Sequence, residues 1–321
     1  MSKMNILVLG SGVSGLTTAM TILQSSDHQV TIWTPQKEGE FSLNSSEAFG
    51  IWLPQRDKRD QRMETWAKYS LKVFTKLAEI PDSGVSMMPV QMLFQGTDKP
   101  WFASDLKTAQ AEAEQFTRDY GSSWIIERAP VIDPSMYLAW LEMNVVRDGA
   151  HFVTKTAENL TDFPDEFDLI INCTGLGSIG LAGDSSLRPA RLQVLTVKNK
   201  TKFNRVVVDE EGPNQPAYIV PQGNTLRLGT VYEENVDSTS ISDTDTDDIL
   251  ARCSRMVPGL KFTRDDVVKV HTFLCPVRDQ VRMEPVGLSK KRSLIHNYGH
   301  HKTGYITSHG IARDIANLIG K

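Results

Sequence analysis

The order of apolar and polar residues predicts alternating strands and helices at the start of the chain. Residues 6–9 are continuously apolar and branched, as in a strand buried on both faces, and a helical pattern follows over residues 13–24. Residues 29–33 form the next predicted strand. A strand, a glycine turn, a helix and a strand within about thirty residues make a βαβ unit, whose crossover forces the strands to be parallel. An α/β fold is therefore predicted.

Later segments divide into helical and strand-like patterns. A helix is predicted over residues 63–77, and a second central strand over residues 169–173. Short β-rich runs separated by Pro, Gly and Asn then predict an antiparallel sheet, with strands at residues 193–197, 205–208, 217–220 and 226–231.

The chain returns to the first pattern near its end, with a short strand at residues 293–296 and a helix at residues 309–319. Before that, the acidic stretch 237–248 precedes a predicted helix at residues 249–256. We interpret its acids as helix caps and loop residues rather than as a metal site, because Ser and Asp favour helix N-termini.

These elements predict a Rossmann-like domain interleaved with a second domain on a mostly antiparallel sheet. The first domain is expected to comprise residues 1–55, 140–185 and 275–321. The second is expected to comprise residues 56–139 and 186–274.

Composition narrows the classes of function. The 321 residues are 40% hydrophobic, enough for a large core, and a net charge of −4 lacks the basic excess that a nucleic-acid partner requires. No segment has the pattern of a signal peptide or a bilayer span, so a cytoplasmic protein without membrane attachment is expected. Three cysteines without a CxxC pair, and histidines without further ligands, predict no disulfide framework and no metal.

A glycine motif follows the first strand and opens the first helix. In a dinucleotide fingerprint, the first glycine makes the turn, the second admits the pyrophosphate and the third lets helix and strand pack closely. The helix N-terminus adds free N–H groups and a positive dipole end. A tight turn without a ligand is the alternative. The six residues of the motif are Gly10, Ser11, Gly12, Val13, Ser14 and Gly15.

One part of the fingerprint is missing at the end of the second strand. An acidic residue usually binds the adenosine ribose there, but Trp33 is followed by Thr34, Pro35 and Gln36. No Arg stands there for a 2′-phosphate, so the gap does not favour NADP. Thr34, a backbone group or water is left as the ribose contact.

Five separated motifs resemble the D-amino acid oxidase family of flavoproteins. They occur in the family's order, and the last begins the family's C-terminal signature. The motifs are the residues 10–19, Asn44-Ser45-Ser46 before Gly50-Ile51-Trp52-Leu53-Pro54, Asn172-Cys173-Thr174-Gly175, Tyr218-Ile219-Val220-Pro221 and His296-Asn297-Tyr298-Gly299-His300.

The resemblance implies that the first domain binds FAD and that the second lines a substrate pocket beside the flavin. Asn44 and Ser45 would contact the pyrophosphate, and Ile51 and Trp52 would lie beside the flavin. Ala157 would border the adenine, and Thr174 and Gly175 would lie near the middle of the cofactor. A loop would cover the pyrimidine side of the flavin, and it contains Gly299, His300, Gly304, Tyr305 and Ile306.

The implied reaction transfers a hydride from the substrate carbon to the flavin. The resulting imine hydrolyses, and dioxygen reoxidises the flavin and becomes hydrogen peroxide. The protein orients the reactants, so no general base is required.

The sequence departs from this family in the implied substrate pocket. Tyr218 matches a tyrosine that helps to hold the substrate carboxylate, but Cys275 replaces the carboxylate-binding Arg and Asn214 replaces a second tyrosine. Lys302 stands where a family backbone group meets the substrate amine, and Ile306 replaces a hydroxylic flavin contact. A neutral thiol cannot replace a bidentate guanidinium, so an amine or a modified amino acid is expected as substrate.

The roles of the altered residues stay open. Lys302 either points inward as a cation or is a solvated loop lysine, and the direction of Arg278 and Arg282 is similarly undecided. Cys275 is either a small buried hydrophobe or a reactive thiol, including a covalent flavin anchor as in the related sarcosine oxidases.

The expected function is an FAD-dependent oxidase or dehydrogenase of a carbon–nitrogen bond. Its expected partners are a small amine or amino-acid-like substrate and dioxygen, and a homodimer is left open. The alternatives are a D-amino acid oxidase proper, a flavin-binding protein without oxidase turnover and, more weakly, a nicotinamide-dependent dehydrogenase. Neither substrate identity nor stereochemistry follows from these motifs.

Overall fold

A computed structural model of the chain describes residues 3–37, 39–40, 43–54, 60–94, 100–112, 122–160, 163–210, 216–288 and 292–320. The chain forms two compact units. The first unit comprises Met1–Val85, Ile132–Pro189 and Cys275–Lys321, and the second comprises Ser86–Val131 and Ala190–Leu274.

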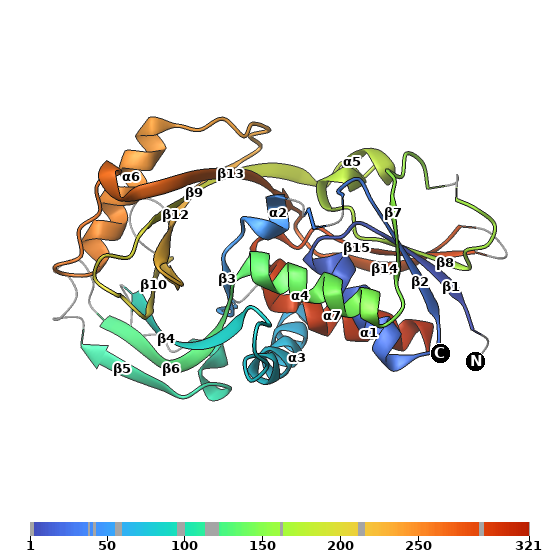
Figure 1. Cartoon of the computed structure of the whole chain (residues 1–321), viewed down its shortest axis with the longest axis horizontal. Helices are drawn as coiled ribbons and strands as arrows, with labels where there is room; N and C mark the ends of the chain where they lie inside the picture. The colour runs from blue at the N-terminus through green and yellow to red at the C-terminus, as the bar shows by residue number, and fades with distance from the viewer. Residues whose placement is uncertain are drawn as a thin grey trace. The chain divides into compact units, whose positions relative to one another are not determined.

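The first unit contains a six-stranded sheet in the order β14-β15-β8-β1-β2-β7 (Figure 1). The strands from β15 to β7 are parallel, and only β14 is antiparallel to its neighbour. This confirms the predicted Rossmann-like α/β fold. Strand bounds are β1 Asn5–Leu9, β2 Gln29–Thr34, β7 His151–Thr154, β8 Leu169–Asn172, β14 Arg282–Gly287 and β15 Ser293–Tyr298, with a short β3 at Gly50–Ile51.

Helix α1 packs against both α4 and α7 in this unit (Figure 1). Its apolar face is fully buried, which explains why the helical pattern was readable from the sequence. Helix α7 begins before the predicted residue 309. The helices are α1 Val13–Ser25, α2 Leu43–Ser46, α3 Arg62–Leu77, α4 Pro134–Arg147, α5 Ser178–Leu181 and α7 Gly304–Ile319, with 3-10 turns η3 Gly175–Gly177 and η5 His301–Thr303.

Helix α3, predicted over residues 63–77, packs on α7 within the first unit. A Cβ on Gly310 would lie 2.3 Å from the Trp66 Cα, so the two helix backbones touch. The Trp66 indole N–H donates to Asp314 at 2.7 Å, and the Gly310 N–H donates to Ser70 at 3.1 Å. The sequence grouped this helix with the second domain, whereas these contacts group it with the nucleotide-binding sheet.

The second unit contains a sheet in the order β13-β9-β12-β11-β10-β4-β6, with β5 pairing β6. Strands β9, β12, β11 and β10 are antiparallel to one another, and β10 runs parallel to β4. The predicted mostly antiparallel sheet is therefore present. The strands are β4 Val85–Phe94, β5 Thr108–Glu112, β6 Ser122–Ile132, β9 Arg188–Lys198, β10 Val206–Asp209, β11 Ala217–Gln222, β12 Thr225–Glu234 and β13 Val267–Val277, with 3-10 turns η1 Trp101–Ser104 and η4 Arg264–Asp266.

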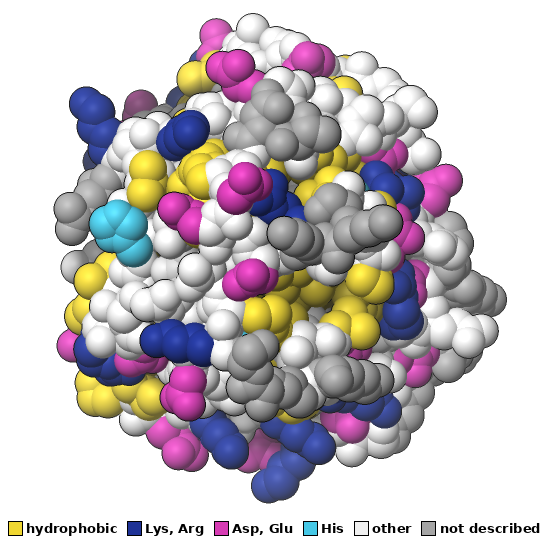
Figure 2. Space-filling view, turned by 90° about the vertical axis from the view of Figure 1, so that its right-hand side faces the viewer, with side chains coloured by type: hydrophobic (Ala, Val, Ile, Leu, Met, Phe, Trp, Pro, Cys, Tyr) yellow, Lys and Arg dark blue, Asp and Glu magenta, His cyan; other side chains and the backbone are white. Residues whose placement is uncertain are grey.

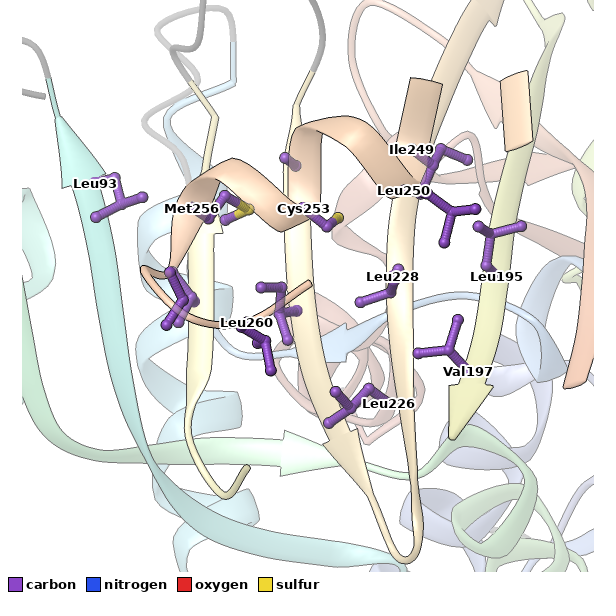
Figure 3. Close-up of a cluster of buried hydrophobic side chains, with 14 of the residues drawn as sticks. Leu93, Leu195, Val197, Leu226, Leu228, Ile249, Leu250, Cys253, Met256 and Leu260 are labelled. Atoms are coloured by element: carbon purple, nitrogen blue, oxygen red, sulfur yellow. The ribbon is translucent and has the colours of Figure 1, made fainter. Parts of the chain in front are cut away.

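Helix α6, Asp243–Met256, covers one face of this sheet (Figure 3). Its apolar side packs against alternate residues of the strands, including Leu195, Ile219 and Leu228. The Ser242 hydroxyl accepts the Asp245 N–H at 3.1 Å and caps the helix. The stretch therefore does cap a helix, but through Ser242. The helix starts before residue 249, so the acids Asp243, Asp245, Asp247 and Asp248 lie inside it and pair with arginines instead of forming caps and loop.

Charged side chains of both signs are interspersed over the face drawn in Figure 2. Among the helices within the described ranges, none has the length and hydropathy to cross a membrane.

Candidate cofactor and substrate sites

The carboxyl ends of four parallel strands meet at one edge of the first unit's sheet. Leu9 of β1 lies opposite Trp33 of β2 and Asn172 of β8, and Asn172 lies opposite His296 of β15. The chain passes from β1 to β2 on one side and later returns through β8 on the other. Ligands of open parallel sheets bind at such a reversal of strand order. We call this region, with the start of α1, the cofactor edge.

The glycine turn at this edge leaves no space for side chains. Gly10 has a φ of +100°, and a Cβ there would lie 2.8 Å from the Cys173 carbonyl oxygen. A Cβ on Gly15 would lie 1.9 Å from the Gly10 carbonyl oxygen. Both glycines are required by backbone contacts, so the turn brings the α1 N-terminus close against the sheet.

Ser45 completes the N-terminal end of α1. Its hydroxyl accepts the Val13 N–H at 3.2 Å, and a Cβ on Gly12 would lie 2.8 Å from that hydroxyl oxygen. Tyr305 donates to the Ser45 carbonyl at 2.7 Å. The N-cap residue itself is Gly12, which has no side chain to cap the helix, and no acidic residue lies in the first turn of α1. Its N–H groups and positive dipole end therefore suit an anion.

Hydroxyl and amide groups occupy the position where a ribose-binding acid was expected. The Thr34 and Ser11 hydroxyl oxygens are 2.8 Å apart, and the Thr34 hydroxyl contacts Gln36 Oε1 at 2.6 Å. Both Ser11 and Thr34 are buried. This chain places neutral hydrogen-bonding groups next to the glycine turn, and they can exchange hydrogen bonds with ribose hydroxyls.

A polar network shapes the turn after β8. Asn172 Oδ1 accepts the Thr174 N–H at 3.1 Å and the Thr174 hydroxyl at 2.8 Å. The Asn172 amide nitrogen also lies 3.1 Å from the Ser178 hydroxyl and 3.3 Å from the His296 ring. Gly175 follows with a φ of +56°. Thr174 and Gly175 are thereby fixed at the cofactor edge.

A buried carboxylate supports the loop that follows β15. Asp184 accepts from Tyr298 at 2.8 Å and Arg278 at 3.0 Å, and Arg282 lies 3.5 Å from it and donates to Tyr298 at 2.7 Å. A Cβ on Gly299 would lie 2.9 Å from the Arg278 Cβ. Burial opposes ionisation of Asp184, but the Tyr298, Ser186 and Arg278 hydrogen bonds lower its pKa overall. Both arginines are thus engaged by Asp184.

His300 is a buried imidazole at the cofactor edge. Its side chain is 7% exposed, and the Asn297 backbone lies near it, yet neither ring nitrogen has a hydrogen bond of normal geometry within the described residues. Burial lowers its pKa to about 4, so the ring is neutral at pH 7. A Cβ on Gly304 would lie 3.8 Å from both the His300 Cβ and the Val13 side chain. A buried ring beside the α1 N-terminus, with hydrogen-bonding capacity that the described residues leave unused, fits a polar cofactor.

Other residues implied as cofactor contacts belong to the packed interior of the first unit. The Trp52 indole is fully buried and donates to the Ala67 carbonyl at 2.9 Å, so its N–H is used by α3. Ile51 and Ile306 are also buried, and Ala157 packs at the margin of the apolar cluster around Trp33. Asn44 and Ser14 are half-buried beside Ser45 and the glycine turn.

The residues implied for the substrate pocket are distributed over both units. In the second unit, Tyr218 is 8% exposed and donates to Glu210 Oε1 at 2.9 Å. In the first unit, Cys275 is 7% exposed and Lys302 is exposed in η5. Asn214 lies outside the described residues. The burial of Cys275 matches a small hydrophobe.

Two acidic residues with defined partners were not anticipated from sequence. Asp184 stands in a turn before β9, and Glu210 opens a polar stretch after β10, where no motif distinguishes an ion-pair or pocket acid from a solvated one. Glu210 could have been suspected only from its proximity in sequence to Tyr218. Among the residues that the structure describes, no three His, Cys, Asp or Glu side chains group as metal ligands.

The model of the FAD-dependent oxidoreductase family matches residues 5–318. The chain is 32% identical to a D-amino-acid oxidase of Streptomyces coelicolor over 317 residues, 98% of this chain and 96% of the relative. It is 28% identical to a D-aspartate oxidase of Homo sapiens over 339 residues, 100% of this chain and 96% of the relative. A glycine oxidase from Geobacillus kaustophilus superimposes with a TM-score of 0.81 at 16% identity, covering 100% of this chain and 95% of that chain. The family match includes both units and the whole cofactor edge.

Proposed function

The chain belongs to the FAD-dependent oxidoreductase family, and on that premise we propose that it oxidises the carbon–nitrogen bond of an amine or a modified amino acid. The protein is an enzyme of this family, and its cofactor is FAD. The observation that carries the proposal is the cofactor edge, where Gly10, Gly12, Ser45 and His300 leave a cradle that fits a large polar cofactor.

The residues of the cofactor edge would hold FAD along its length. Gly12, Val13 and Ser45 would bind the pyrophosphate through backbone N–H groups and a hydroxyl. The Ser11 and Thr34 hydroxyls would bind the adenosine ribose in place of the usual acid. The turn at Thr174 and Gly175 and the loop from Gly299 to Ile306 would contact the remainder, as the family resemblance implies.

Bound FAD would supply a hydride acceptor, and the substrate would leave as an imine. Dioxygen, the proposed electron acceptor, would reoxidise the flavin and become hydrogen peroxide. The chain's own residues bind and orient the substrate, and neutral His300 accepts or donates a hydrogen bond without adding charge. The family resemblance implies that Tyr218, whose hydroxyl donates to Glu210 Oε1 at 2.9 Å, would be one of the residues that contact the substrate. Assembly as a homodimer stays a proposal to be measured by light scattering of the purified protein.

Anaerobic flavin bleaching tests this function. Purified holoenzyme is mixed without oxygen with D-amino acids, L-amino acids, N-alkyl amino acids and amines that lack a carboxylate. Loss of the visible flavin bands with at least one of these classes, and their return with hydrogen peroxide when air is admitted, is expected. FAD that no member of the panel reduces would contradict the proposal and favour a flavin-binding protein without turnover.

A D-amino acid oxidase proper is the second candidate, since relatives of this chain carry that name. Against it, the sequence position implied for the carboxylate-binding Arg holds the buried Cys275, and the nearby Arg278 and Arg282 are both engaged by Asp184. Bleaching confined to D-amino acids would favour this candidate. Bleaching by amines without a carboxylate would favour the first.

A further inference from the structure

Tyr305, in the first turn of α7, forms a hydrogen bond with a segment 260 residues away in the sequence. Its hydroxyl donates to the Ser45 carbonyl at 2.7 Å, and its side chain is 4% exposed. Burial raises the pKa of the Tyr305 phenol well above its ordinary value, so the hydroxyl keeps its proton and remains a donor. Breaking a buried hydrogen bond of this kind costs free energy, so the bond holds the Ser45 backbone in place.

Ser45 lies in an element that needs support from the rest of the unit. Helix α2 contains only the four residues Leu43–Ser46. A helix of this length is not stable by itself, and the carbonyl groups at its C-terminal end have no partner within it. The Tyr305 hydroxyl supplies a donor to one of these carbonyls. The position of Ser45 therefore depends in part on α7.

The side chain of Ser45 is bonded to the start of α1. Its hydroxyl accepts the Val13 N–H at 3.2 Å and lies next to the N-cap residue Gly12. A serine hydroxyl has one proton to donate as well as two lone pairs. While a lone pair accepts from Val13, the proton can be donated to an anion at the α1 N-terminus. A shift of the Ser45 backbone would move this donor away from the anion.

The ring of Tyr305 is packed against a second buried tyrosine. The ring centroids of Tyr305 and Tyr137 of α4 are 6.1 Å apart, and the Tyr137 hydroxyl lies 2.7 Å from His309 Nε2, one turn along α7 from Tyr305. Tyr137 and His309 are both buried. Each tyrosine hydroxyl thus makes a buried hydrogen bond that involves α7, but only that of Tyr305 reaches Ser45.

We propose that Tyr305 is a positioning residue for the pyrophosphate of FAD and acts through Ser45 rather than by touching the flavin. This inference rests on the proposed function, because the pyrophosphate would bind at the same cofactor edge. The family resemblance implies a different role for Tyr305, a contact on the flavin's pyrimidine side. A flavin contact affects only ligands that carry a flavin, whereas a residue that positions Ser45 affects every ligand that carries the diphosphate.

Calorimetric titration of the full-length apoprotein with ADP and with FAD separates the two roles. ADP carries the adenosine and the diphosphate but no flavin. Tyr305→Phe keeps the ring and removes the hydroxyl, and it is expected to weaken the binding of both ligands by the same factor of about five to ten, as for one buried hydrogen bond. The visible spectrum of FAD bound to the variant should match that of the wild type, because the surroundings of the flavin are unchanged.

Two further variants separate positioning from general stability. If Tyr305 acts through the Ser45 hydroxyl, Tyr305→Phe should weaken ADP binding in the wild-type background and add little in a Ser45→Ala background. Tyr137→Phe is the matched control, because it removes a buried tyrosine hydroxyl that bonds to the same helix. It should lower the urea midpoint of the apoprotein as Tyr305→Phe does, and leave the affinity for ADP at its wild-type value.

Three results would overturn the positioning role. They are an unchanged ADP affinity in Tyr305→Phe, an equal loss of ADP affinity in Tyr137→Phe, and full additivity of Tyr305→Phe with Ser45→Ala. The first, combined with weaker FAD binding, would assign Tyr305 to the flavin, and the second would show a general loosening of α7. These affinities do not depend on turnover. FAD that binds normally but that no amine reduces would therefore contradict the proposed oxidation and leave the role of Tyr305 standing.

Discussion

The cofactor edge of the first unit and the surroundings of Tyr218 in the second unit use their polar groups differently. At the cofactor edge, the groups beside the glycine turn are neutral hydroxyls, an amide and an uncharged imidazole, while the charged groups Asp184, Arg278 and Arg282 bind one another. In the second unit, the Tyr218 hydroxyl donates to the Glu210 carboxylate. A neutral, backbone-lined cradle fits a cofactor common to many enzymes, whereas a charged site distinguishes between substrates.

If this comparison is right, substitutions at the cofactor edge change FAD binding and stability, and substitutions around Tyr218 change substrate choice. The largest effect is expected for Gly15→Ala, because its Cβ would lie 1.9 Å from the Gly10 carbonyl oxygen and backbone must move. We expect a loss of more than about 3 kcal/mol in unfolding free energy and at least about tenfold in FAD affinity.

The measurements for Gly15→Ala are urea unfolding of the apoprotein and titration with FAD. Gly180→Ala is the matched control in the same unit, since no atom lies within 4 Å of the added Cβ. If Gly15→Ala bound FAD with wild-type affinity, the proposed dependence of FAD binding on the glycine turn would be wrong.

A smaller loss is expected for Asp184→Asn, which leaves Arg278 and Arg282 without their shared carboxylate. Removing one member of a buried ionic cluster should lower the unfolding free energy by about 2 kcal/mol at pH 7. The pKa of Asp184 is lowered in the folded protein, so its stabilisation is complete above its unfolded pKa and is lost as pH falls through the folded value.

The difference between wild type and Asp184→Asn should therefore shrink below about pH 4, where the unfolded carboxyl also takes up its proton. Urea unfolding between pH 3 and pH 7 measures it. A difference that is constant over this range would show that the carboxylate charge is not what stabilises the loop after β15.

His300→Gln should change the pH dependence of stability more than its value at pH 7. Burial lowers the pKa of His300 to about 4, so the unfolded chain binds one more proton than the folded chain between pH 6.5 and pH 4. Stability contributed by the neutral ring is complete above pH 6.5 and falls toward pH 4, with a slope near 1.4 kcal/mol per pH unit. The variant should lose that part of the slope.

Burial also lowers the pKa of His296 to about 4 and of His309 to about 3, so a residual slope from these histidines should remain in His300→Gln. His151→Gln, at an exposed position, controls for the loss of an imidazole. An unchanged slope in His300→Gln apoprotein would mean that the ring is not buried as a neutral group.

The smallest effect is expected for Thr34→Val, which removes the hydroxyl between Ser11 and Gln36 while keeping the side-chain shape. We expect about 1 kcal/mol less stability and FAD binding weakened by about fivefold. Fluorescence titration of the apoprotein with FAD measures the affinity. An unchanged affinity would mean that Thr34 does not bind the ribose, and that FAD binding at the cofactor edge depends on the glycine turn.

The sequence by itself determined the nucleotide-binding fold and the glycine turn. The buried strands at residues 6–9 and 169–173 were readable because parallel strands are apolar on both faces, and Gly10 and Gly15 were readable because only glycine fits those backbone contacts. The antiparallel sheet and the serine cap at the start of α6 followed from turn and capping chemistry that acts over a few residues.

Tertiary structure alone decided which distant residues meet. It placed α3 on α7, bound Arg278 and Arg282 to Asp184, buried the neutral His300 ring at the cofactor edge and joined Tyr218 to Glu210. Sequence patterns could not supply these contacts, because a charged residue in a loop looks the same whether it faces water or another charge. The glycine turn therefore identifies the cofactor from local chemistry, while the charges that choose a substrate are defined only where separate strands meet.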